Sequence, residues 1–167
     1  FDILIQACQI LKTRGIEYRL KILGDGSDRA QLLSLIQMFG LMDNIELLGY
    51  KKNVYAYIKN AQFFVSSSRF EGLPLVLIEA LILGKAVIAT DCVSGPREIL
   101  ANGQYGCLIP TENAEALADA LALFLTKKEF VNSFENITED KIARYQDVAI
   151  AKALAEILAG VSNRNSL

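Results

Sequence analysis

Apolar residues along the chain follow two spacings that alternate from segment to segment. A helical spacing predicts helices at residues 1–14, 27–39, 54–59, 75–83, 113–125 and 138–158. Short apolar or alternating runs predict strands at residues 18–23, 45–48, 62–66, 86–90 and 106–109. Helices that alternate with short apolar strands are typical of a parallel sheet covered on both faces. The pattern therefore predicts a doubly wound, Rossmann-like α/β fold in one domain, residues 1–160, followed by a frayed tail, residues 161–167.

The helix predicted at residues 75–83 differs from the others because it is apolar on every side, so we expect it to be buried. Pro74 suits the first helical position, and a glycine turn at Gly72 precedes it. Glu79 is the only charged residue of this helix. A lone carboxylate in a buried helix is costly unless it is hydrogen-bonded or paired. Because helical side chains lean toward the N-terminus, we expect Glu79 to point back toward Glu71.

The ends of the predicted strands are polar and mostly contain glycine. They are residues 24–26, 49–51, 66–72 and 91–95. Ligands of doubly wound sheets bind outside the carboxyl ends of the strands. The backbone N–H groups of residues 72, 73 and 75 form an anion site at the start of a helix. Together with two carboxylates, this arrangement predicts a site for a nucleotide-like ligand that carries hydroxyls and phosphate.

Each of these features also has a purely structural interpretation. Glu79 would be satisfied by backbone amides or by a nearby cation, Arg69 or Arg97. Glu71 taken alone would be a solvated loop acid, and the residues around Gly95 would form a simple turn. The segment Gly24-Asp25-Gly26 suggests dinucleotide binding, but an arginine stands where the NAD fingerprint needs its third glycine. A structural turn and a close approach to a ligand remain equally open there.

Composition excludes several classes of function. The net charge is −2 and no basic block is present, so we expect no nucleic-acid partner. The chain has no histidine, which removes Ser/His and Cys/His nucleophiles and histidine metal sites, and no Asp-x-Asp motif is present. The three cysteines are far apart and fit buried thiols in a reducing compartment. With no signal peptide and no apolar run long enough to span a membrane, the sequence predicts a cytoplasmic protein.

The segment Ser-Arg-Phe-Glu-Gly-Leu-Pro-Leu-Val-Leu-Ile-Glu-Ala-Leu at residues 68–81 resembles the Glu-x7-Glu signature of family 4 glycosyltransferases. The flanking segments at residues 20–26, 47–50 and 86–100 agree in the same order. The resemblance covers about residues 1–125. It implies the C-terminal, donor-binding half of a GT-B enzyme, which transfers a sugar from a nucleotide donor with retention, without a metal and without a cofactor.

The resemblance also implies roles for individual residues. Glu71 resembles the first glutamate of the signature, which contacts the donor sugar, and Glu79 resembles the second, which holds the ribose. The N–H groups of the turn and helix start would bind the diphosphate. The glycine after the first strand and the backbone of residues 50–51 would border the base. The expected site residues are therefore catalytic Glu71 and donor-binding Gly24, Tyr50, Lys51, Gly72, Leu73, Pro74, Leu75 and Glu79.

Two parts of the family pattern are absent from these 167 residues, namely the upstream strand that clamps the phosphates and the N-terminal acceptor domain. We therefore expect these residues alone to be inactive and their full-length parent to be active. A missing strand would leave a gap or an exposed edge in the sheet, which favours self-association. The family resemblance also leaves open a peripheral attachment of the parent to membranes.

The function expected from the resemblance is transfer of a hexose-type sugar from a nucleotide sugar, by preference a UDP-sugar. The acceptor would be a glycan or a lipid-linked molecule in polysaccharide biosynthesis. The alternative from another class is a non-catalytic nucleotide-sugar binding domain of the same fold. Glu71 favours the enzyme, because a nucleotide binder needs no carboxylate at the sugar position. A GT-B epimerase is a weaker third alternative, since it would normally bring histidines to its site.

Overall fold

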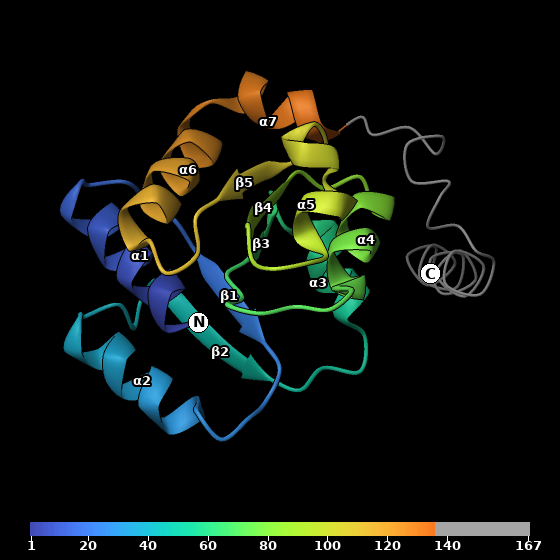
Figure 1. Ribbon diagram of the computed structural model, residues 1–167. Helices are drawn as coiled ribbons and strands as arrows, with labels where there is room; N and C mark the ends of the chain where they lie inside the picture. The colour runs from blue at the N-terminus through green and yellow to red at the C-terminus, as the bar shows by residue number, and fades with distance from the viewer. Residues whose placement is uncertain (136–167) are drawn as a thin grey trace, which may run out of the picture.

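The computed structural model describes residues 1–135 of the chain, and Figure 1 shows their arrangement. The helices are α1 (Asp2–Thr13), α2 (Arg29–Met38), α3 (Val54–Asn60), α4 (Leu75–Ile82), α5 (Pro96–Ile99), α6 (Ala114–Thr126) and α7 (Lys128–Glu135), with the 3₁₀ helix η1 (Ala101–Gly103). The strands are β1 (Leu20–Leu23), β2 (Ile45–Gly49), β3 (Phe64–Ser66), β4 (Val87–Thr90) and β5 (Cys107–Ile109). Every strand predicted from the sequence is present, and the helix predicted at 138–158 and the tail lie outside the described residues.

All strand pairs are parallel, as the sequence pattern predicts, but the strands form two sheets. β1 pairs with β2 in one sheet, and the other sheet has the order β3-β4-β5. Within residues 1–135, β1 pairs only with β2 and β3 pairs only with β4, so each of these two strands has one edge that pairs with no strand. The sequence pattern shows which segments are strands but not which neighbours they find, so this division was not predictable from apolar runs alone.

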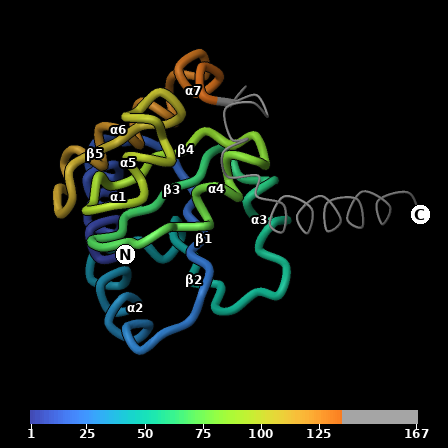
Figure 2. Tube along the Cα trace, turned by 45° about the vertical axis from the view of Figure 1, so that its right-hand side comes forward, coloured from blue at the N-terminus to red at the C-terminus, as the bar shows by residue number. Residues whose placement is uncertain are grey.

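Helices cover both faces of the strands. Figures 1 and 2 show α1, α2 and α6 on one side and α3 and α4 on the other. The larger core lies under α1 and α6 and contains residues of both sheets, including Ile22 and Ile45 of the first and Ile88 and Ile109 of the second. The smaller core joins α3, α4 and α5 to β4. The doubly wound α/β class expected from the sequence is confirmed.

Helix α4 departs from its prediction in two details. Pro74 is the residue before the helix, with φ −73° and ψ 89°, and not its first helical residue. Leu77, Ile78 and their neighbours on one side are buried, whereas the side chain of Leu75 is 43% exposed. The prediction of burial on every side is therefore wrong for the first turn.

Candidate functional site

The loop between β3 and α4 carries Glu71, whose carboxylate is oriented by its own loop. The hydroxyl of Ser68 donates a hydrogen bond to Glu71 Oε1 at 2.6 Å. The hydroxyl of Ser94, from the loop after β4, donates to the backbone oxygen of Glu71 at 2.9 Å. Glu71 is partly buried. The simple picture of a solvated loop acid therefore does not describe this residue, because both its side chain and its backbone are held.

The loop after β4 packs directly on the turn that leads into α4. Gly95 has φ +86°, and a Cβ atom at this position would lie 2.5 Å from both the Gly72 oxygen and Pro74 Cδ. Glycine is thus required at residue 95 for its backbone conformation and for the close approach of the two loops. This contact fixes the entry of the chain into α4, where Leu75, as the first helical residue, has an N–H group without an intrahelical partner.

Glu79 lies in the second turn of α4 and is half-buried. The hydroxyl of Tyr55, from α3, donates a hydrogen bond to Glu79 Oε1 at 3.3 Å. Burial first, and then the charge and hydrogen bond of Glu79, raise the pKa of Tyr55. The two cations considered from the sequence bind other acids: Arg97 pairs with Asp91, and Arg69 pairs with acids on α1 and before α6. Glu79 thus accepts a hydrogen bond from a neutral hydroxyl, which the sequence did not reveal.

A cleft of about 1420 Å³ lies between the two sheets, along the edges of β1 and β3 that pair with no strand of residues 1–135. It is lined by residues from both sheets and their following loops. Four expected site residues line it, namely Gly24, Tyr50, Lys51 and Glu71. Val76 of α4 also lines it, whereas Gly72, Leu73, Pro74, Leu75 and Glu79 are not among its lining residues. The structure therefore brings the residues expected beside the base and the carboxylate expected beside the sugar to one space, whereas the expected anion-binding residues lie between the lining residues Glu71 and Val76 in sequence and do not line it.

The polar lining at the end of β3 was not among the expected site residues. Ser66, Ser67 and Ser68 all line the cleft between the sheets. A run of three serines at the carboxyl end of a strand was a usable signal, because that is the edge at which ligands of such sheets bind. Ser68 in particular touches the Glu71 carboxylate.

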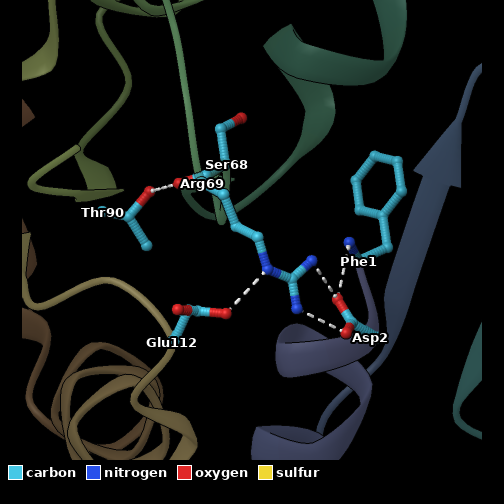
Figure 3. A network of polar contacts seen from close by, with 6 residues as sticks. All are labelled: Phe1, Asp2, Ser68, Arg69, Thr90 and Glu112. Atoms are coloured by element: carbon cyan, nitrogen blue, oxygen red, sulfur yellow. Dashed lines mark hydrogen bonds and ion pairs between the residues drawn. The ribbon is translucent and has the colours of Figure 1, made fainter. Parts of the chain in front are cut away.

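A cluster of charges stands beside the same loop, and Figure 3 shows it. Arg69 makes two hydrogen bonds to Asp2 at the start of α1, at 3.0 and 2.6 Å, and one to Glu112 at 3.1 Å. The Arg69 guanidinium lowers the pKa of Asp2 to about 2. No spacing in the sequence links residues 2, 69 and 112, so this cluster could not be anticipated.

The described residues also bear on metal binding, membrane crossing and the state of the cysteines. Within residues 1–135, no group of three or more histidine, cysteine, aspartate or glutamate side chains is placed to hold a metal ion. In this described part of the chain, no helix combines the length and the apolar character needed to cross a membrane. Cys8 and Cys92 are buried and Cys107 is partly buried, and all three are free thiols.

The sequence matches the family described as Glycosyl transferases group 1 over residues 1–141. One similar protein is the N-acetylgalactosamine-N,N'-diacetylbacillosaminyl-diphospho-undecaprenol 4-alpha-N-acetylgalactosaminyltransferase of Campylobacter jejuni. It is 33% identical over 158 residues, which are 95% of this chain and 42% of that protein. The amylovoran biosynthesis glycosyltransferase AmsD of Erwinia amylovora is 30% identical over 141 residues, 84% of this chain and 40% of that protein.

Solved structures agree with these sequence matches at the level of the fold. A crystal structure of Anabaena HepE in complex with UDP-glucose has a TM-score of 0.79 at 22% identity, and covers 95% of this chain and 44% of that one. The apo form of the lipopolysaccharide outer core galactosyltransferase WaaB has a TM-score of 0.72 at 26% identity, with 93% and 44% covered.

The chain belongs to the glycosyl transferases group 1 family. It spans less than half the length of the relatives named above. The resemblance to GT-B glycosyltransferases of family 4, and to the C-terminal half of their fold, is thereby confirmed.

Proposed function

We propose that this chain is the donor-binding part of a glycosyltransferase that moves a hexose-type sugar from a UDP-sugar to a glycan or lipid-linked acceptor in polysaccharide biosynthesis. Family membership supports the reaction class. The observation that carries the proposal is the cleft in which Glu71 faces the same space as Gly24, Tyr50 and Lys51. The Campylobacter jejuni relative is named for a diphospho-undecaprenol acceptor, which supports a lipid-linked acceptor.

In this proposal the UDP lies across the mouth of the cleft. Its base borders Gly24 and the backbone of residues 50–51, and Glu79 accepts hydrogen bonds from the ribose. The N–H groups at the start of α4 bind the diphosphate and stabilise the charge that develops as it leaves. Glu71, held by Ser68, accepts hydrogen bonds from the sugar hydroxyls. The transfer proceeds with retention and without a metal, and no further cofactor takes part.

The acceptor, in this proposal, is bound by another part of the full-length protein, which works in the cytoplasm or at a membrane surface. Detectable sugar transfer by these 167 residues alone would contradict this division of labour. The same assay on the full-length protein separates an enzyme from a non-catalytic nucleotide-sugar binding domain.

Calorimetric titration of the chain tests the donor site. UDP, UDP-glucose, UDP-galactose, UDP-N-acetylglucosamine and NAD are compared on the wild type, Glu79→Ala and Glu71→Ala. Losing a hydrogen bond to a charged group costs roughly 1.5–3 kcal/mol, so Glu79→Ala should weaken UDP and the UDP-sugars alike. Glu71→Ala should weaken the UDP-sugars and leave UDP unchanged. Glu46→Ala, which removes an exposed carboxylate of β2, is the matched control.

Two results would contradict the proposal. Binding of NAD would place the chain among dinucleotide binders. UDP affinity that is indifferent to Glu79 would remove the assignment of this residue to the ribose.

A further inference from the structure

The side chain of Arg69 joins three segments that are far apart in the sequence. Its two terminal nitrogens bind the two carboxylate oxygens of Asp2, at 3.0 and 2.6 Å. Its Nε donates to Glu112 Oε1 at 3.1 Å. Figure 3 shows the guanidinium between these two acids, which come from the start of α1 and from the loop before α6. The planar guanidinium of an arginine suits this arrangement, because it can donate two parallel hydrogen bonds to one carboxylate and a third to another.

Arg69 stands two residues before Glu71, in the loop that also carries Ser68. The Thr90 hydroxyl donates a hydrogen bond to the backbone oxygen of Ser68, which ties the loop to the end of β4. The Ser68 hydroxyl in turn donates to the Glu71 carboxylate. Thr90 therefore holds one side of the loop and Arg69 holds the other. The strand before the loop, β3, is only three residues long, so these contacts add to the few backbone bonds that hold the loop.

We propose that Arg69 is a positioning residue, which holds the β3–α4 loop so that the Glu71 carboxylate meets the donor sugar. This inference rests on the function proposed above for Glu71. Arg69 touches no ligand in it and acts through the loop. Ion pairs between exposed side chains contribute little to folding stability, and the Arg69 side chain is 42% exposed. The gain lies in preorganisation, because a loop that is already ordered loses less freedom when the sugar binds.

Arg14 supplies a matched control for Arg69. It also binds two acids, Glu115 at 2.9 Å and Asp119 at 2.6 Å, and its exposure is similar, at 36%. It joins the end of α1 to α6, and its two acids lie on α6 and not on the loop that carries Glu71. Arg69→Gln and Arg14→Gln each remove one positive charge and its ion pairs with two acids, and a change in the loop that carries Glu71 is expected for Arg69→Gln alone.

The first measurement compares the dissociation constants of UDP and UDP-glucose for the 167-residue chain. Arg69→Gln should weaken UDP-glucose by roughly 3- to 10-fold, the range for one net hydrogen bond, and leave UDP within about two-fold. Arg14→Gln should leave both unchanged. Asp2→Asn should reproduce part of the Arg69→Gln effect, and the double variant should be no weaker than Arg69→Gln alone, because Arg69→Gln already removes the contact with Asp2. Equal behaviour of Arg69→Gln and Arg14→Gln would overturn the proposal.

The second measurement does not depend on sugar binding. NMR order parameters of the residue 70, 71 and 72 amides should fall in Arg69→Gln and remain at the wild-type values in Arg14→Gln. Unchanged order parameters would overturn the positioning role. If UDP-glucose binds the wild type no more tightly than it binds Glu71→Ala, the function proposed for Glu71 fails. The order parameters then still decide whether Arg69 holds the loop.

Discussion

Replacing Gly95 by alanine tests whether the contact between two loops sets the start of α4. The new Cβ would lie 2.5 Å from both the Gly72 oxygen and Pro74 Cδ, and ordinary contact begins at 3.4 Å. One of the two loops must therefore move back by about 0.9 Å, the difference between these values. The residue also has φ +86°, which is strained for alanine.

Gly95→Ala should lower the stability of the fold in two ways, and a substitution at a second glycine distinguishes them. The positive φ costs about 1–3 kcal/mol of stability, and the added atom costs about 1–3 kcal/mol through overpacking. Gly103 has φ +93° with no atom within 4 Å of its Cβ position, so Gly103→Ala carries the first cost without the second. Gly95→Ala should thus unfold more readily than Gly103→Ala in thermal denaturation.

The ligand-binding assay gives the decisive comparison. A shift of about 0.9 Å at Gly72 and Pro74 moves the N–H groups at the start of α4, so UDP should bind to Gly95→Ala roughly ten-fold more weakly or worse. Gly103→Ala should keep the wild-type affinity. Equal UDP affinities for the two variants, measured well below their unfolding temperatures, would refute the inference that this contact positions the diphosphate site.

Three further predictions concern other parts of the molecule. Tyr55→Phe removes the hydroxyl that binds Glu79, so calorimetry should show UDP weakened by no more than about ten-fold; an unchanged affinity would mean that the ribose does not need this orientation. The pKa of Asp2 is lowered from 3.8 to about 2 in the folded chain, so its pairing with Arg69 stabilises the fold above about pH 4 and is lost as the pH falls toward 2. The free energy of unfolding, measured with denaturant, should accordingly fall less between about pH 4 and pH 2 for Asp2→Asn than for the wild type. Among residues 1–135, one edge of β1 and one edge of β3 pair with no strand, which favours pairing between chains. Sedimentation should therefore reveal association that grows with concentration, and a single monomeric species at all concentrations would contradict this.

The sequence predicted those features of the fold that depend on local pattern. Parallel strands with buried residues such as Ile88 follow from short apolar runs. The turn at Gly95 was also expected, although its contact with Gly72 was not. The pairing of Tyr55 with Glu79 spans 24 positions and that of Arg69 with Asp2 spans 67, and no spacing rule connects such residues.

The candidate site was predictable to a similar degree. Glu71 was identified through its motif and the polar strand ends through general rules for such sheets. The expected burial of Leu75 is wrong, because an apolar residue in the first turn of a helix can still be exposed. Ser68 was overlooked because its importance comes from a hydrogen bond to Glu71, which is visible only once the loop is folded.

The division of the strands into two sheets has a mechanical consequence. No backbone ladder joins β1 and β2 to the other three strands within residues 1–135. The two bodies are held together by side-chain packing under α1 and α6, in a core that both share. A small rocking of one body against the other would change the distance between Gly24 and Glu71 on opposite walls of the cleft without breaking any strand–strand hydrogen bond.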